Sequence, residues 1–198
     1  MSGAFKDISD YLSHRHLVST EQVYYRLMEL WKQKGSMHEH LFDDLLTDLG
    51  LIEDIGPLVH IFNSHKPVIE PYIETVQVLQ ELKAKGIILG IITDGNVERQ
   101  KRKIESLGIS KFFKARIYTM EIGKSKASVR PFLEIAGELK VDAKYCAYVG
   151  DNPILDFKGA KKAGMRTVRL LRGEFRNLIG NKDIDYEISD LRDILTMI

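Results

Sequence analysis

Two uninterrupted apolar segments in the C-terminal part of the chain constrain its fold more than any other feature. They are IILGIIT (87–93) and YCAYVG (145–150), each about one strand in length. Such segments are typical of strands buried on both faces of a parallel sheet. Helical patterns follow them at 97–107, 128–139 and 154–163, and shorter strand patterns stand in ARIYT, RTVRLL and DYEIS. The alternation predicts a doubly wound α/β sheet.

The N-terminal part has a different pattern of apolar residues, which predicts helices only. Ser19 and Thr20 are suitable caps for a helix whose apolar residues recur at helical spacing, and Gly50 suits the end of a second helix. A third helix is expected over 56–63. The C-terminal part then begins with a helix from Pro71, which suits a first turn, to Lys85. We therefore expect a helical domain at residues 1–68 and an α/β core at 69–198.

Composition narrows the class of protein. The 198 residues are 44% hydrophobic and 29% charged, with a formal net charge of +1, so nothing indicates a nucleic-acid-binding surface. A single cysteine, Cys146, excludes a disulfide framework. No apolar segment reaches the roughly 20 residues that a membrane span needs, and the first residues lack the apolar core of a signal peptide. We expect a cytoplasmic protein without a nucleic-acid or membrane partner.

Polar residues follow two of the expected strands, where ligands bind in open α/β sheets. Thr93, Asp94 and Gly95 end the first strand and precede a helix whose dipole favours an anion, so they are candidates for phosphate binding. A plain turn and helix cap is the alternative. Asp151 and Asp156 follow Gly150 and offer the hard oxygen ligands that Mg²⁺ prefers, although a loop acid and a helix-terminal acid are equally compatible with the pattern.

The segment GKSKASVRPF supplies a candidate cation between these two clusters. Lys126 is the favoured residue for contacting a phosphate as a point charge, and Lys124 is the rival. RTVRLLRGEFR is also locally basic; a solvated face is the expected reason, and contact with an anionic substrate is the alternative. A hydroxyl, a lysine and paired acids thus follow one another on successive strand ends, a collection that binds a phosphate and a divalent cation.

These motifs resemble those of the haloacid dehalogenase superfamily, the aspartate-nucleophile phosphatases, over about residues 71–198. IILGIITDGN resembles the family's second motif, GKSKASVRP its third and YVGDNPILDFKGAKKAGM its fourth. The resemblance implies that Thr93 hydrogen-bonds the transferring phosphoryl group and that Lys126 neutralises its charge. It implies that Asp151 binds Mg²⁺, with Asp156 as a ligand or as an acid behind it. The helical domain would be the family's cap.

The sequence departs from this family at the first motif, a strand ending in Asp-x-Asp that carries the nucleophile and the general acid/base. No such motif precedes residue 86, and Asp7 and Asp10 lie in an expected helix, so the catalytic roles are not carried over to them. In the family this strand lies between the Thr93 strand and the Asp151 strand. Without it, each neighbour leaves unpaired backbone groups, at roughly 1–3 kcal/mol for each buried group.

Three explanations stay open for the missing strand. Met1 could be an internal methionine of a longer natural protein, which is the favoured one; the chain could be a pseudoenzyme with a rearranged sheet; or a homodimer could fill the gap. The resemblance implies a hydrolase: Mg²⁺-dependent hydrolysis of a small phosphorylated metabolite through an aspartyl-phosphate, with this chain inactive by itself. The alternative is a non-catalytic protein that binds a phosphate ligand or a protein partner.

Overall fold

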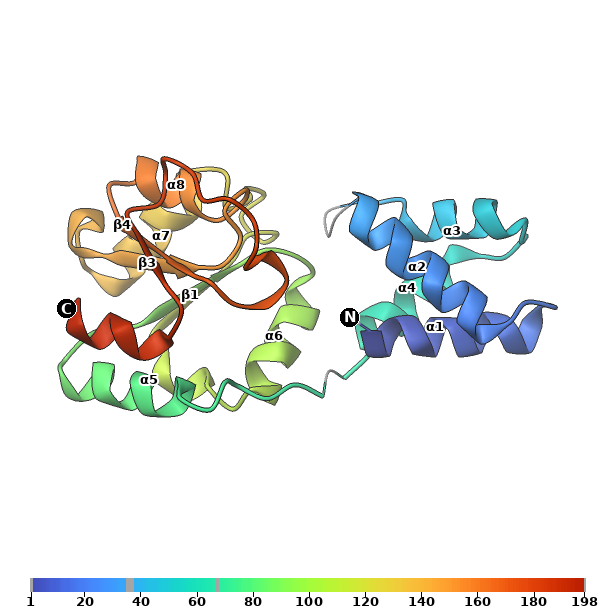
Figure 1. The fold of residues 1–198 in the computed structure, drawn as a ribbon, viewed down its shortest axis with the longest axis horizontal. Coiled ribbons are helices and arrows are strands. Elements are labelled where there is room, and N and C mark those ends of the chain that lie inside the picture. Colours follow the sequence, from blue (N-terminus) through green and yellow to red (C-terminus); the bar gives the residue numbers. More distant parts are fainter. Residues whose placement is uncertain (1, 35–37, 67, 198) are drawn as a thin grey trace. The chain divides into compact units, whose positions relative to one another are not determined.

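The computed structural model describes residues 2–34, 38–66 and 68–197. The chain divides into two compact units, one formed by Met1–Ile69 with Lys101–Ser106 and one by Glu70–Gln100 with Leu107–Ile198 (Figure 1). The expected domains at 1–68 and 69–198 stay a prediction. None of the described helices is long and apolar enough to cross a lipid bilayer.

The first unit is helical, as the sequence predicts. Its helices are α1 (Ser2–Arg15), α2 (Thr20–Lys34), α3 (Leu41–Leu49) and α4 (Ile55–Ser64). The Ser19 hydroxyl accepts a hydrogen bond from the Gln22 amide at 3.0 Å and so caps α2, and Gly50 ends α3 in the left-handed conformation, with φ of 62°. Phe5 lies at the centre of the core, with ring-centroid distances of 5.9 Å to both Trp31 and Phe62.

The second unit alternates strands and helices, which confirms the α/β class. Its strands are β1 (Gly90–Thr93), β2 (Ala115–Tyr118), β3 (Ala147–Gly150), β4 (Arg166–Leu170) and β5 (Tyr186–Ile188). Its α-helices are α5 (Thr75–Ala84), α7 (Arg130–Leu139) and α8 (Phe157–Lys162), together with the start of α6 (Val97–Ser106). Short 3₁₀ helices complete it: η1 (Ser110–Phe112), η2 (Ala143–Tyr145), η3 (Gly173–Phe175) and η4 (Leu191–Thr196).

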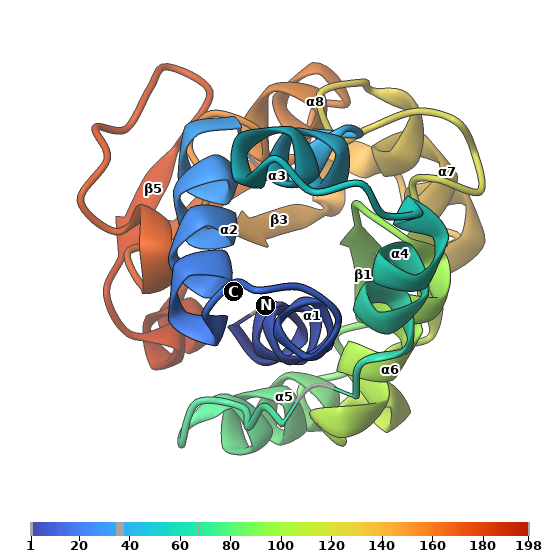
Figure 2. The ribbon, with the colours of Figure 1, turned by 90° about the vertical axis from the view of Figure 1, so that its right-hand side faces the viewer.

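The strands form two separate parallel sheets. β1 pairs with β2, with Thr93 opposite Tyr118, while β3, β4 and β5 form the other sheet in that order, with Gly150 opposite Arg169. Within the described ranges no backbone pairing joins β1 to β3, and Figure 2 shows them as separate arrows. The sheet is therefore interrupted at the position where the sequence predicts a missing strand, and it does not rearrange to close the interruption.

Both sheets nevertheless share the same two helical layers. On one side Ile92 of β1 and Tyr148 of β3 pack against the core around α7, where the Phe132 and Tyr148 rings are 4.9 Å apart. On the other side Leu89 and Val149 pack against the core that contains Val78 and Leu82 of α5. β1 and β3 are thus parts of one interrupted layer between α5 and α7.

Several element boundaries differ from the sequence prediction, among them the start of α8, which is Phe157 and not Ile154. α5 begins at Thr75 and not at Pro71, because the Thr75 amide donates to the Tyr72 carbonyl in a turn at 2.9 Å. β1 covers only 90–93 of the expected 87–93, since the Ile87 amide bonds back to Leu82 at the end of α5. The last expected helix is the 3₁₀ helix η4.

Candidate active site

Thr93 lies at the carboxyl end of β1, where the sequence predicts phosphate binding. Its hydroxyl is half-buried and donates a hydrogen bond to Gln100 Oε1 at 3.0 Å. Gly95 takes a φ of +104°, which an L side chain rarely adopts, and turns the chain towards α6. The Asn96 side chain accepts from the Arg99 amide at 3.0 Å and so caps this helix. A hydroxyl and a helix N-terminus are therefore adjacent at this strand end.

Asp94 points along the sheet edge and joins two loops. Its Oδ1 accepts from the Thr119 hydroxyl at 2.6 Å and from the Lys126 amide at 3.2 Å. Thr119 directly follows β2, so Asp94 ties the end of β1 to the end of β2 and to the lysine loop. The Asp94 carboxylate is thereby occupied in positioning Lys126, a role that the sequence did not indicate.

Lys126 reaches across to the second sheet. Its Nζ donates to Asp156 Oδ1 at 2.5 Å, and its side chain is 17% exposed. Lys124 is exposed. The geometry favours Lys126 over Lys124 as the lysine of this site.

Asp156 is the buried acid behind the Asp151 loop, with 3% of its surface exposed. Besides Lys126, it accepts hydrogen bonds through Oδ2 from the Asp151 amide at 3.1 Å and from the Asn152 amide at 3.0 Å. Both of its oxygens are therefore already bonded within the protein. Of the two acids that the sequence offers as metal ligands, this geometry favours Asp151 for direct contact and Asp156 for holding its loop.

The electrostatics around β3 indicate a place for a cation. Burial raises the pKa of Asp151, and the Asp156 charge raises it further, while Lys126 opposes the shift. Burial also holds the pKa of Tyr148 well above its ordinary value, and the charges of Asp156, Asp94 and Asp151 add to this. Lys126 bonds to two of these carboxylates, to Asp156 through its ammonium group and to Asp94 through its backbone amide.

Magnesium fits this environment as an ion that takes only some of its ligands from the protein. It usually keeps several waters and takes one or two carboxylates plus substrate phosphate. Asp151 offers such a carboxylate, and a bound cation would offset the repulsion from Asp156. In the part of the chain that the structure describes, no group of three or more His, Cys, Asp or Glu side chains is arranged to hold a metal ion. The residues present therefore supply part of a ligand set.

Arg169 on β4 supports this end of the sheet and was missed by the sequence prediction of a solvated basic face. The residue is 1% exposed. Its guanidinium donates to the carbonyls of Phe175 and Leu178 and to Glu187, each at 2.8 Å, and to the Asp151 carbonyl at 3.4 Å. One buried cation thus joins the Asp151 loop to the loop after β4. An arginine between the apolar residues Val168 and Leu170 of the strand was the available signal.

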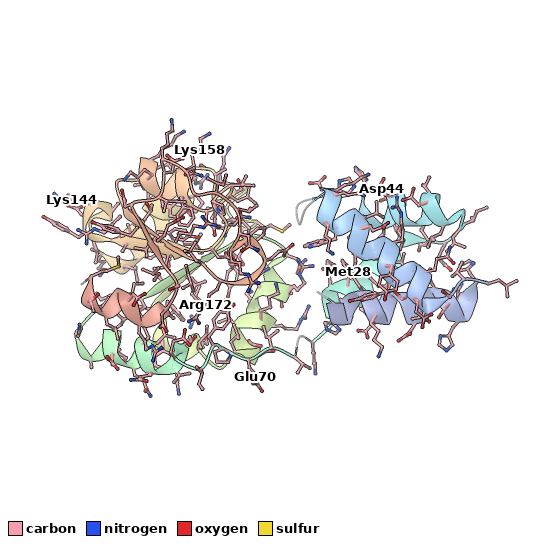
Figure 3. All side chains as sticks on the ribbon, in the orientation of Figure 1. Met28, Asp44, Glu70, Lys144, Lys158 and Arg172 are labelled. Atoms are coloured by element: carbon pink, nitrogen blue, oxygen red, sulfur yellow. The ribbon has the colours of Figure 1, made fainter. Side chains whose placement is uncertain are left out.

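Arg172, which follows β4 and is labelled in Figure 3, makes further contacts within this unit. It pairs with the buried Glu74 ahead of α5, donates to the Ser189 carbonyl at 2.9 Å, and lies 4.9 Å from the centre of the Tyr72 ring. These contacts fix the chain segment that leads into α5. Arg172 is therefore a structural residue of this unit.

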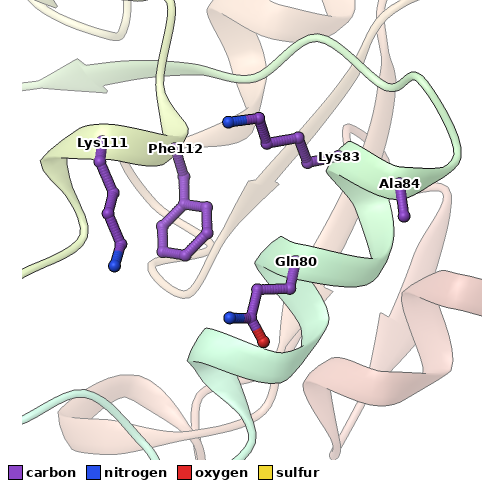
Figure 4. A pocket seen from close by; sticks show the side chains of 5 residues that line it. All are labelled: Gln80, Lys83, Ala84, Lys111 and Phe112. Carbon is purple, nitrogen blue, oxygen red and sulfur yellow. The ribbon is translucent and has the colours of Figure 1, made fainter.

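A pocket of about 440 Å³ lies elsewhere in the same unit (Figure 4). It is lined by Gln80, Lys83, Ala84, Lys111 and Phe112. The elements that carry these residues lead into β1 and β2, so the pocket lies at the amino ends of the strands. It is separate from the site at their carboxyl ends.

The fold and site define a doubly wound α/β protein with a charged cluster at the carboxyl edge of its parallel strands. The chain belongs to the haloacid dehalogenase-like hydrolase family, whose sequence profile matches residues 10–170. The match includes Thr93, Lys126, Asp151 and Asp156. Family membership, first indicated by the motifs, is therefore confirmed.

Several curated relatives are phosphatases. The glyceraldehyde 3-phosphate phosphatase of Methanopyrus kandleri is 33% identical over 188 residues, which cover 91% of this chain and 81% of the relative. The enzyme of the same name from Pyrococcus abyssi is 34% identical over 197 residues, with coverage of 96% and 83%. A phosphoserine phosphatase of Thermus thermophilus is 29% identical over 161 residues, covering 81% of this chain and 64% of the relative.

Solved structures agree with the fold. A HAD phosphatase from Thermococcus onnurineus superposes with a TM-score of 0.71 at 24% identity, over 98% of this chain and 87% of that one. YfnB from Bacillus subtilis, a HAD hydrolase bound to magnesium, also gives a TM-score of 0.71, at 19% identity, over 99% and 90% of the two chains. At these identities the likeness concerns the fold.

Proposed function

We propose that this chain forms the phosphate- and magnesium-binding part of a phosphatase that acts on a small phosphomonoester. The observation that carries the proposal is the contact of Lys126 with Asp156, which brings the lysine loop after β2 against the Asp151 loop after β3. The glyceraldehyde 3-phosphate phosphatases and the phosphoserine phosphatase among the relatives support a three-carbon substrate, and glyceraldehyde 3-phosphate is the first to test.

Each residue has a separate task in this proposal. The Thr93 hydroxyl turns from Gln100 Oε1 to donate its one proton to a phosphoryl oxygen. The Lys126 ammonium places a positive charge beside the same group. The Asp151 carboxylate holds magnesium, which when bound supplies further positive charge to the phosphoryl oxygens. Asp94 and Asp156 hold Lys126 and the Asp151 loop in place. Charge stabilisation of this kind is a large part of phosphoryl-transfer catalysis.

None of the described residues is a candidate for the attacking carboxylate of such a phosphatase. Asp94 is bonded to Thr119 and Lys126, and Asp7 pairs with His65 Nδ1 at 2.6 Å within the helical unit. We therefore expect the 198-residue chain to bind phosphate without hydrolysing esters by itself. The lack of an attacking carboxylate among the described residues equally supports a second candidate function, that of a non-catalytic protein that binds a phosphate-bearing ligand.

Phosphate binding tests the proposal directly. Inorganic phosphate is titrated into the full chain with and without Mg²⁺, and the ³¹P signal reports binding. We expect Mg²⁺ to tighten binding, and Asp151→Asn and Lys126→Ala each to weaken it at least tenfold. Lys124→Ala, a matched control in the same loop, should change affinity less than twofold. Equal effects of the two lysine substitutions, or binding indifferent to Mg²⁺, would contradict the proposal.

A further inference from the structure

We propose that the Tyr72 hydroxyl helps to hold magnesium at Asp151, by accepting a hydrogen bond from a water molecule that the ion keeps. This inference rests on the proposed function, which assigns the Asp151 carboxylate to magnesium. The sequence pattern gave Tyr72 no role, because the residue lies in the expected first turn of a helix and follows no strand. The structure places its hydroxyl beside the Asp151 carboxylate.

The position of Gly173 shows how close these two groups lie. A Cβ at position 173 would be 3.7 Å from Asp151 Oδ2 and 3.9 Å from Tyr72 Oη. Among the described residues, no other atom lies within 4 Å of that point outside Gly173 and its two chain neighbours. The two oxygens therefore border one small space, which the glycine leaves open and which any side chain there would fill.

The Tyr72 ring is held in place although the residue is 51% exposed. The Arg172 guanidinium lies 4.9 Å from the centre of the ring. Its own position is fixed by a pair with the buried Glu74, a 3.7 Å contact with the Asp190 carboxylate and a hydrogen bond to the Ser189 carbonyl at 2.9 Å. The phenol is thus oriented before a ligand binds, which reduces the cost of binding. The two carboxylates also offset the arginine charge, which would otherwise oppose a nearby cation.

The Tyr72 hydroxyl is free to bind a ligand. Within the described ranges the side chain contacts Arg172 through its ring, and its oxygen has no hydrogen-bond partner. A phenol oxygen accepts hydrogen bonds as well as donating one. Magnesium usually keeps several of its waters, and a cation makes its bound water a stronger donor. A water in the space beside Gly173 therefore suits both the ion at Asp151 and the hydroxyl.

The backbone at Gly173 gives a second reason for a glycine, which a matched variant can separate from the first. Its φ is +70°, a conformation that L side chains rarely adopt, so an alanine there is strained whatever the space. Gly86 has a φ of +77°, and nothing lies within 4 Å of a Cβ there. Gly86→Ala therefore introduces backbone strain alone, whereas Gly173→Ala also fills the space beside Asp151 and Tyr72.

Calorimetric titration of MgCl₂ into the full chain, without phosphate, tests the proposal. Tyr72→Phe keeps the ring on Arg172 and removes only the hydroxyl. We expect it to weaken Mg²⁺ binding about three- to tenfold, the effect of one lost hydrogen bond, with an unchanged melting temperature. Tyr145→Phe is the matched control and should leave the affinity unchanged, because this ring also contacts a cation, Lys144 at 5.0 Å, but lies at the amino end of β3.

The glycine variants test the space itself. Gly173→Ala should weaken Mg²⁺ binding at least as much as Tyr72→Phe does, and Gly86→Ala should leave it unchanged. Unchanged affinity in Tyr72→Phe, an equal loss in Tyr145→Phe, or equal losses in the two glycine variants would each overturn the proposal.

Asp151→Asn, titrated in the same way, separates this inference from the proposed function. If Asp151→Asn abolishes Mg²⁺ binding while Tyr72→Phe leaves it unchanged, the role of Tyr72 alone is refuted. If Asp151→Asn binds Mg²⁺ as the unaltered chain does, or if the unaltered chain binds none, the proposed function fails and the role of Tyr72 fails with it.

Discussion

The Lys126 ammonium lies 2.5 Å from the Asp156 carboxylate, and the other oxygen of that carboxylate holds the Asp151 amide at 3.1 Å. Lys126 is in turn fixed through its own amide to Asp94 after β1. A chain of hydrogen bonds therefore joins the carboxyl ends of two sheets that share no strand pairing. At the site these side chains hold the two sheets together, in addition to the helical layers that both sheets share.

Loss of the Asp156 carboxylate should destabilise this unit strongly. Asp156→Ala leaves Lys126 without its partner and two loop amides without their acceptor, and removing one partner of a buried pair costs about 3–5 kcal/mol. Denaturant unfolding measures the difference. Asp142→Ala is the control, because its 3.6 Å contact with Lys144 is exposed and should contribute less than about 1 kcal/mol. Equal losses in the two variants would contradict the assigned role.

Substitution of Gly159 should displace Lys126 without touching its side chain. A Cβ at position 159 would meet the carbonyl oxygens of Ser128 and Lys126, which are backbone atoms and cannot move cheaply. We expect Gly159→Ala to lower the melting temperature and to weaken phosphate binding. Gly137→Ala is the matched control, since nothing lies within 4 Å of a Cβ there and a helical alanine is favoured by about 1 kcal/mol. A neutral Gly159→Ala would refute the close packing.

Arg169 should be essential to the loop after β4. Arg169→Met removes the guanidinium donor of the Leu178 carbonyl and one of the two donors of the Phe175 carbonyl, which keeps the Leu178 amide at 3.0 Å. Hydrogen bonds to a charged group contribute about 1.5–3 kcal/mol each. Limited proteolysis in 171–185 should speed up as the unfolding free energy falls. Glu187→Gln removes only the partly exposed partner and should have a much smaller effect. If both variants behave alike, the ion pair and not the carbonyl contacts holds the loop.

Stability should depend on pH through Asp185. The hydrogen bond from Lys161 lowers the pKa of this carboxyl below its ordinary value of 3.8, and the Thr167 amide and hydroxyl lower it further. Because the folded pKa is the lower one, its stabilisation is present above the unfolded pKa and is lost as pH falls through the folded pKa. The difference in melting temperature between the protein and Asp185→Asn should therefore be largest near neutral pH and shrink in acid.

The sequence predicted the α/β class and the order of its elements because buried strands and caps have local signatures. The runs before Thr93 and Asp151 are apolar, and Gly50 is the kind of residue that ends helices. Contacts made across the fold have no such signature. The bonds of Asp94 to Thr119 and of Asp156 to the Asp151 amide depend on which loops meet, so the positioning roles were not predictable. For the same reason Arg169 looked like a surface residue.

Turnover of a phosphomonoester by the full 198-residue chain tests the central claim most directly. With glyceraldehyde 3-phosphate and Mg²⁺ we predict phosphate release no faster than the background without protein, although the same chain binds phosphate through Lys126 and Asp151. Mg²⁺-dependent turnover that disappears in Asp151→Ala would contradict this, because the described residues would then have to supply an attacking group.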